Sequence, residues 1–308
     1  MSETLTLTHG CSLSNLPLFV ASAAGLFADE GLDVHAPPYS HMSSTAQALA
    51  TGAADLGTAA FTQPLIDASS ALPPVLVAGS GLMGIAVLAQ PGTGYIGDLL
   101  GRPIGTFRGD PLEVLLHDLL AAGGLSEADV EIQFLDHIED AIYAFRDGHL
   151  AGITLAEPHA TRLRHSGAVE LSDGTELWGT PFPDTVLVSS RKLLTERPEV
   201  VAAAIRALLR AEGLIADDHV AAVRSAAEHF PGYDIGLLVE ASLRQPPCVD
   251  LRRLVPVVHA RWGSLGELGL VTPGSPHPTS AIDLTLLERE LVARPPHPTR
   301  PAHEGATP

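Results

Sequence analysis

Apolar and polar positions alternate with two different periods along the first part of the chain. Leu5 and Leu7 alternate with threonines, which is typical of a strand, whereas the apolar residues of 16–27 recur at helical spacing. Consecutive units of strand and helix predict a largely parallel sheet. The elements predicted here are a strand at 4–8, a helix at 16–27, a strand at 32–35, a helix at 43–51 and a strand beginning at 54.

Two apolar runs of buried-strand length follow, at 75–78 and 85–89. Gly79, Gly81 and Gly84 lie between them, and glycines spaced in this way predict a loop.

The same alternation starts again near residue 103, which predicts a second α/β lobe. Its predicted strands are 103–107, 130–135 and 153–155, and its helices are 111–122 and 138–147. After a strand at 185–189 the pattern becomes helical, with candidate helices at 198–217, 220–229, 235–243 and 251–268. The Pro-rich segment 294–308 buries too little to offset its ordering entropy, so we expect a disordered tail.

The charge balance excludes several classes of partner. The 308 residues carry a formal net charge of −18, which repels phosphate backbones and anionic lipids, so we expect no nucleic-acid partner. Charged residues make up 18% and hydrophobic residues 45%, a globular composition. No apolar run approaches the roughly 18 to 20 residues that span a bilayer, so we expect no membrane insertion.

The opening segment MSETLTLTHGCS lacks the basic and apolar regions of a signal peptide. We therefore expect a cytoplasmic protein as the sequence stands, and an extracytoplasmic one if the N-terminus is truncated. Cys11 and Cys248 form no C-x-x-C motif, and the scattered histidines show no zinc-binding spacing. Walker and G-x-G-x-x-G motifs are also absent, so the sequence predicts neither a metal nor a cofactor.

Five phrases, taken together and in this order, resemble the SsuA/THI5-like (NMT1/THI5-like) branch of the type II periplasmic-binding-protein fold. They are LPLFVASAAGLFADEGLDV at 16–34, STAQALATGAADLG at 44–57, DLLGRPIGT at 98–106, AEPHATRL at 156–163 and VSSRKLLTERPEVVAAAIRALLRA at 188–211. Proteins of this family are mostly receptors of importers for sulfonates, nitrate or thiamin precursors, while a minority are enzymes that use the same cleft.

The resemblance implies an α/β fold with two lobes, a two-strand hinge and C-terminal helices that pack on the first lobe. A small ligand would bind between the lobes, with hinge closure on binding. We place lobe 1 at 1–88 and 187–293, lobe 2 at 89–186, and the hinge crossings near 85–90 and 186–189.

The loops after the predicted strands supply the candidate ligand-binding residues, because clefts of such folds lie at strand carboxyl ends and helix N-termini. Arg108 follows a strand and precedes a helix, and is the candidate clamp for an anion unless it pairs with Asp110. Glu157 resembles the family's Glu-Pro pair, and acidic stabilisation of a helix N-terminus explains it equally well. The other candidates are His9, Cys11, Asn15, His41, Ser43, Phe61, Thr62, Met83 and Phe107.

Cys11 raises a second interpretation. A thiol becomes a nucleophile where a histidine or a helix N-terminus depresses its pKa, and His41 follows a neighbouring strand. Cys11, with Asn15 four residues on, resembles the nucleophile segment of aryl sulfinate desulfinase, in which a histidine on the following loop supports the cysteine. That enzyme's Arg-x-Gly-Gly element has no counterpart, since the comparable stretch reads Leu-Gly-Thr-Ala at 56–59.

The leading hypothesis is a binding protein for a small polar or anionic organic solute, with an ABC permease as partner if the protein is exported. The alternative is a cytoplasmic desulfinase-like lyase or hydrolase that uses Cys11 with His41. A third reading is an intracellular sensor or scavenger of a ligand, without a transporter.

Overall fold

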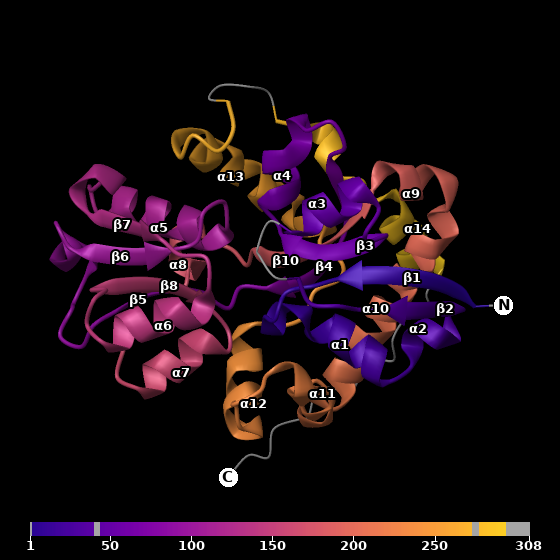
Figure 1. Ribbon diagram of the computed structural model, residues 1–308, viewed down its shortest axis with the longest axis horizontal. Helices are drawn as coiled ribbons and strands as arrows, with labels where there is room; N and C mark the ends of the chain where they lie inside the picture. The colour runs from indigo at the N-terminus through magenta and orange to yellow at the C-terminus, as the bar shows by residue number, and fades with distance from the viewer. Residues whose placement is uncertain (1, 40–43, 273–276, 294–308) are drawn as a thin grey trace, which may run out of the picture.

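Two mixed β-sheets form the centres of two α/β lobes in the computed structural model (Figure 1). The structure describes residues 2–39, 44–272 and 277–293. The strands are β1 (Glu3–Thr8), β2 (Leu32–His35), β3 (Leu56–Ala60), β4 (Pro74–Leu82), β5 (Ile85–Ala89), β6 (Pro103–Thr106), β7 (Glu131–Phe134), β8 (Gly152–Ala156), β9 (Val169–Ser172) and β10 (Pro183–Ser190).

Helices cover both sheets. The α-helices are α1 (Leu16–Ala23), α2 (Leu26–Asp29), α3 (Ser44–Thr51), α4 (Gln63–Ile66), α5 (Pro111–Ala122), α6 (Ile138–Arg146), α7 (His159–His165), α8 (Thr175–Trp178), α9 (Arg191–Glu196), α10 (Pro198–Asp217), α11 (His219–Ser225), α12 (Ile235–Arg244), α13 (Val255–Glu267) and α14 (Thr285–Ala293). The 3₁₀ helices are η1 (Leu13–Asn15), η2 (Asp67–Ser69), η3 (Ile96–Leu99), η4 (Glu127–Asp129), η5 (Ala227–His229), η6 (Arg252–Leu254) and η7 (Thr279–Ala281).

The two sheets share one plan. The first has the order β2-β1-β3-β10-β4 and the second β7-β6-β8-β5-β9. In each sheet one strand, β10 or β5, runs antiparallel to both of its neighbours. That strand is the one by which the chain enters from the other lobe. This exchange of strands is the two-lobed, type II periplasmic-binding-protein-like arrangement that the sequence predicted.

The first crossing between the lobes is a tight turn. Leu82 ends β4 in the first sheet and Ile85 begins β5 in the second, with Met83 (φ 54°) and Gly84 (φ 71°) between them in the left-handed region. Residues 85–88, which we had placed in lobe 1, therefore pair in the second sheet. The return crossing precedes β10, whose pairing in the first sheet begins at Pro183 and not near 187.

The loop predicted around Gly79 and Gly81 is strand, because β4 continues to Leu82. These glycines serve close packing instead of a turn. A Cβ on Gly81 would lie 2.5 Å from the Cα of Ser14, so only glycine lets the backbone of η1 approach β4 this closely. Gly79 likewise faces the backbone carbonyl of Cys248.

The C-terminal helices pack on the first lobe, where α10 contacts α1 and α14 contacts α10. Two of them also reach the second lobe: α12 contacts α7, and α13 contacts α5. Figure 1 shows these two helices on opposite edges of the molecule, with the second lobe between them. Glu240 of α12 pairs with His165 of α7, and Arg261 of α13 pairs with Asp118 of α5.

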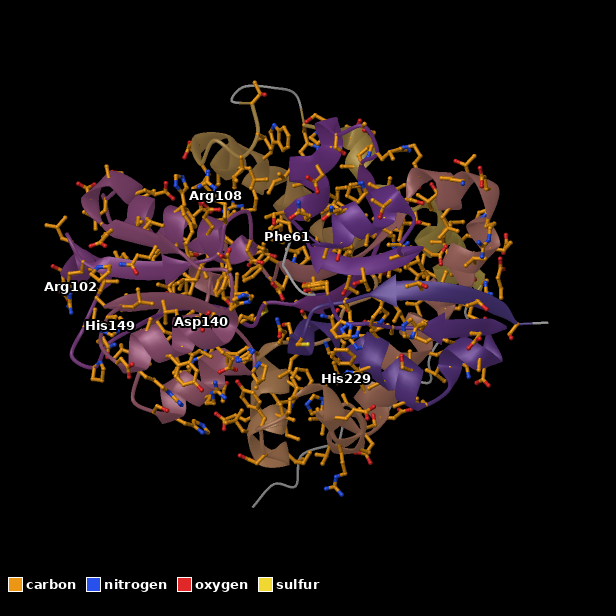
Figure 2. All side chains as sticks on the ribbon, viewed as in Figure 1. Phe61, Arg102, Arg108, Asp140, His149 and His229 are labelled. Atoms are coloured by element: carbon orange, nitrogen blue, oxygen red, sulfur yellow. The ribbon has the colours of Figure 1, made fainter. Side chains whose placement is uncertain are left out.

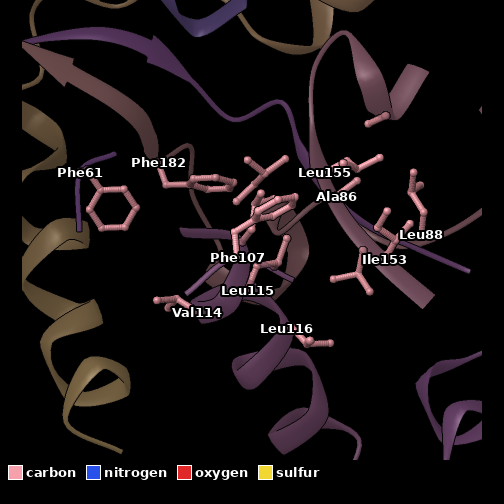
Figure 3. Packing of buried hydrophobic residues seen from close by; sticks show 14 of the residues in the cluster. Phe61, Ala86, Leu88, Phe107, Val114, Leu115, Leu116, Ile153, Leu155 and Phe182 are labelled. Carbon is pink, nitrogen blue, oxygen red and sulfur yellow. The ribbon is translucent and has the colours of Figure 1, made fainter. Parts of the chain in front are cut away.

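The apolar core continues across the hinge. One cluster joins Phe61, Leu76 and Val186 of the first lobe to the interior of the second, which includes Phe107 and Phe182 (Figure 3). A separate cluster packs α1 and α10 against the other face of the first sheet. No helix within the described residues is long and apolar enough to cross a membrane.

Candidate functional site

A cavity of about 360 Å³ lies between the two lobes. The first lobe lines it with the loop after β1 and with the start of β10, and the second lobe with the segments that follow β6, β7 and β8. Most of these segments follow the carboxyl ends of parallel strands, where open α/β sheets place ligands. The sheet topology thus accounts for the position of the site.

Direct hydrogen bonds join the lobes beside the cavity. On one side the amide of Leu13 donates to the carbonyl oxygen of Glu157 over 3.2 Å, and the hydroxyl of Ser12 donates to the same oxygen over 3.4 Å. On the other side the hydroxyl of Thr62 donates to the carbonyl oxygen of Gly109 over 2.6 Å. The two lobes are therefore closed on one another in this structure.

Two buried carboxyl groups, one from each lobe, border the cavity. Asp110 caps the N-terminus of α5, where its Oδ1 accepts from the amide of Leu112 over 3.0 Å. Asp184 lies on β10, and its Oδ2 accepts from the side-chain amide of Gln245 over 2.9 Å. Each residue is only 6% exposed, and neither forms an ion pair with a basic side chain of the described residues.

These surroundings favour the protonated forms. Burial, together with the nearby charge of Asp184, raises the pKa of Asp110 from 3.8 to about 8. Burial also raises the pKa of Asp184 to about 6, although hydrogen bonds from Ser14, Thr185 and Gln245 oppose the change. The pKa of the Tyr39 hydroxyl, which borders the same cavity, is raised by burial and by both carboxylates.

Arg108, which is labelled in Figure 2, borders the cavity. Its positive charge is already compensated by the carboxylate of Glu113. Its Nη1 donates to Oε1 of the buried Glu113 over 2.6 Å, and its Nη2 donates to the carbonyl oxygen of Leu268 over 3.1 Å. The guanidinium also lies 5.0 Å from the ring centre of Phe134. Arg108 pairs with Glu113 and not with Asp110, and its predicted role as an anion clamp stays a prediction.

His9 and Asn15 lie at the two ends of the segment that follows β1. His9 is buried within the first lobe, where its ring nitrogens contact the carbonyl oxygens of Gly10 and Ala36 and its ring packs edge-on against Phe19. Asn15 borders the cavity, and its Nδ2 donates to the carbonyl oxygen of Gly10 over 3.0 Å. Its Oδ1 is buried and accepts no hydrogen bond from the described residues.

The remaining described candidates occupy different positions. Phe107 borders the cavity. Phe61 is fully buried in the apolar core (Figure 3) and does not border the cavity. Met83 lies in the hinge turn. The side chain of Glu157 is fully buried and pairs with Arg164 over 2.6 Å, so it supports the fold beside the cleft.

A sequence profile of the family described as NMT1/THI5 like matches residues 13–222, more than half of the chain. The chain belongs to the NMT1/THI5-like family. A Brucella abortus (strain 2308) protein that carries a binding-protein name is 26% identical over 195 residues, which are 63% of this chain and 60% of that protein. The match thus spans well under two thirds of that relative's length.

Solved structures share the fold over nearly the whole chain. The alkanesulfonate-binding protein SsuA of Xanthomonas axonopodis pv. citri, bound to MOPS, has a TM-score of 0.78 at 20% identity and covers 92% of this chain and 100% of its own. The periplasmic nitrate-binding protein NrtA of Synechocystis PCC 6803 has a TM-score of 0.81 at 14% identity, covering 95% and 89%. The desulfurization enzyme DSZB has a TM-score of 0.70 at 16% identity, covering 94% and 99%.

Cys11 of this NMT1/THI5-like chain is exposed and borders the cavity. Its thiol is nevertheless partly desolvated by neighbouring atoms, which raises the pKa of the thiol. An activated nucleophile requires the opposite, a lowered pKa. His41 and Ser43, the other residues predicted for this region, lie outside the described residues.

The sequence interpretation overlooked much of the polar lining. Asp110 was considered only as a partner for Arg108, His159 was set aside with the other scattered histidines, and Asp184 was not considered at all. A signal was present for Asp184, because it is the one charged residue in the strand PDTVLVSS, which has an apolar centre. His159 also borders the cavity, and burial lowers its pKa to about 4, so its ring is neutral near pH 7. In the described parts of the chain, no cluster of His, Cys, Asp or Glu could hold a metal ion.

Proposed function

We propose that this protein is the solute-binding component of an ABC importer, which holds a small polar organic molecule between its lobes and delivers it to a membrane permease. The observation that carries the proposal is the cavity of about 360 Å³ whose walls come from both lobes. A solute bound there would contact both lobes at once, and its binding energy would favour the closed arrangement.

The walls of the cavity suit a small organic molecule. Its volume lies within the range of about 300 to 1,000 Å³ that is usual for such ligands. Phe107, Leu112, Ile138 and Leu155 supply apolar surface, and a few polar groups face them. Membership of the NMT1/THI5-like family supports a binding role. The class of solute has to be inferred from the chemistry of the residues that line this cavity.

Filling the cavity should abolish binding. Ala156 borders it at the end of β8, and Ala156→Trp would place an indole in the space that a solute needs. Thermal-shift screening of a library of small polar solutes, followed by calorimetry, should identify a solute that binds the wild-type protein. We expect its affinity to fall by at least about a hundredfold, or roughly 2.7 kcal/mol, in Ala156→Trp.

Ala121→Trp provides the matched control, because Ala121 is exposed on α5 and does not border the cavity. It should bind the solute as the wild-type protein does. A solute that binds Ala156→Trp with unchanged affinity would occupy another site and would contradict the proposal.

The enzymatic alternative makes a different prediction about Cys11. Burial raises the pKa of its thiol. The rate of labelling by iodoacetamide should therefore increase at a higher pH than for an ordinary thiol, whose pKa is about 8.5. Cys248 is an internal control, since burial and nearby carboxylates raise its pKa to about 12. Cys11 should therefore react before Cys248, and both slowly at pH 7.

Peptide mass spectrometry of the labelled protein from pH 5 to pH 9.5 would measure both rates. A Cys11 rate that already reaches its plateau near pH 7 would reveal an activated thiolate. That outcome would favour a desulfinase-like enzyme over a binding protein.

A further inference from the structure

Four acidic residues border the cavity: Asp110, Asp136, Glu139 and Asp184. Asp110 and Asp184 are buried and lack a basic partner among the described residues, and Asn15 has a side-chain oxygen that accepts no hydrogen bond. Asp136 and Glu139 add two carboxylates at the exposed edge of the cavity. Four acidic residues around one cavity favour a ligand that carries positive charge and donates hydrogen bonds.

Around the start of α5, the donors that could hold an anion are already occupied by the protein's own carboxylates. The amide of Leu112, at the N-terminus of α5, donates to Asp110, and the amide of Gly109 donates to Glu113 over 2.6 Å. Glu113 also accepts a hydrogen bond from Nη1 of Arg108. A sulfonate or carboxylate in this cavity would therefore displace an internal acceptor and would lie beside two buried acidic groups.

We propose that the cleft selects a small organic cation, an ammonium or amidinium, which Asp110 and Asp184 bind from opposite lobes. This inference rests on the proposed binding function and specifies its solute class. The aromatic rings of Phe107 and Tyr39 border the same cavity and can pack against the apolar part or the charged group of such a cation. The net charge of −18 also attracts cations to the protein surface.

Binding of a cation should be coupled to the release of a proton. Asp110, with its pKa of about 8, is mostly protonated at pH 7 in the unliganded protein, and a cation beside it favours the ionised form. Affinity should therefore rise as the pH increases from about 6 to about 8. The other titratable groups that border the cavity, besides Arg108, are Cys11, Tyr39, Asp136, His137, Glu139 and His159.

The test uses matched triplets of probes that share one scaffold and differ in charge. Benzylammonium, benzyl alcohol and phenylmethanesulfonate form one triplet, and butylammonium, butanol and butanesulfonate form another. Calorimetry should show that the ammonium member binds most tightly in each triplet. Asp110→Asn and Asp184→Asn should each weaken its binding by at least about tenfold, whereas Asp217→Asn, which removes an exposed charge at the end of α10, should not.

Proton release is the second measurement. Titrations at pH 7 in phosphate and in Tris, whose ionisation enthalpies differ, should report between about half a proton and one proton released per ammonium bound. Asp110→Asn should abolish this release. If the release persists in Asp110→Asn, another group loses the proton and the assignment to Asp110 is overturned.

The possible outcomes separate the two proposals. If the sulfonate or the alcohol binds most tightly, with affinity unchanged in Asp110→Asn and Asp184→Asn, the selection of cations is wrong but the binding function stands. The binding function itself is contradicted if no molecule of the triplets or of the wider solute library binds the wild-type protein more tightly than Ala156→Trp.

Discussion

Asp110→Asn should stabilise the unliganded protein at pH 8 by several kcal/mol and leave its stability near pH 4 almost unchanged. The pKa of Asp110 is raised from 3.8 to about 8, and one unit of pKa corresponds to about 1.4 kcal/mol, so ionising this group in the folded protein costs on the order of 5 kcal/mol. Asparagine keeps the acceptor that caps α5 and carries no charge. The measurement is the free energy of unfolding by urea between pH 4 and pH 9.

The sign of the effect follows from proton binding. Between pH 4 and pH 8 the unfolded chain has lost the proton of Asp110 while the folded protein retains it, so stability falls as the pH rises through this range. Asp184→Asn should remove a smaller loss that ends near pH 6, in line with the pKa of about 6 for Asp184. Asp217→Asn is the control for the change in net charge. Parallel stability curves for the wild-type protein and Asp110→Asn would show that Asp110 is not held in its protonated form.

Arg164→Met should lower the free energy of unfolding by about 3 to 5 kcal/mol, because it leaves the carboxylate of Glu157 buried without its counter-charge. The side chain of Glu157 is 0% exposed, and its Oε1 lies 2.6 Å from Nη1 of Arg164. The amide of Thr161 donates to the other carboxylate oxygen over 2.9 Å and cannot by itself neutralise the charge. Urea unfolding at pH 7 measures the loss.

Two further variants test the cause of this loss. Adding Glu157→Gln to Arg164→Met removes the unpaired charge and should recover part of the stability. Arg252→Met breaks an ion pair with Asp250 that is largely open to solvent, so it should have a much smaller effect. A double variant as unstable as Arg164→Met alone would show that lost packing, and not a buried charge, is responsible.

The alternation of strand and helix predicted two α/β lobes, because local periodicity identifies βα units. The arrangement of the lobes around a hinge was implied by the family resemblance of the five phrases. The exact hinge positions were less accessible. Gly79 and Gly81 have the composition of a loop, but they lie in β4 because η1 and the segment around Cys248 pack against them from distant parts of the chain. Contacts of that kind leave no local pattern in the sequence.

The candidate site was predicted in part. Cys11, Asn15, Phe107 and Arg108 do border the cavity, because strand ends locate a cleft from the sequence alone. The sequence could not show that Glu113 neutralises Arg108, since that depends on how the loop before α5 folds back on the helix. Nor could it show that Asp110 and Asp184 become buried, because Asp184 contacts the side chain of Gln245, which lies far from it in the sequence.

The contacts of α12 and α13 with the second lobe include two ion pairs that differ in their exposure to water. On the α13 edge, Asp118 is 13% exposed and accepts from both Arg261 and Ser264. On the α12 edge, the side chains of His165 and Glu240 are each about half exposed. Water competes more effectively for the second pair, so less free energy is needed to separate it.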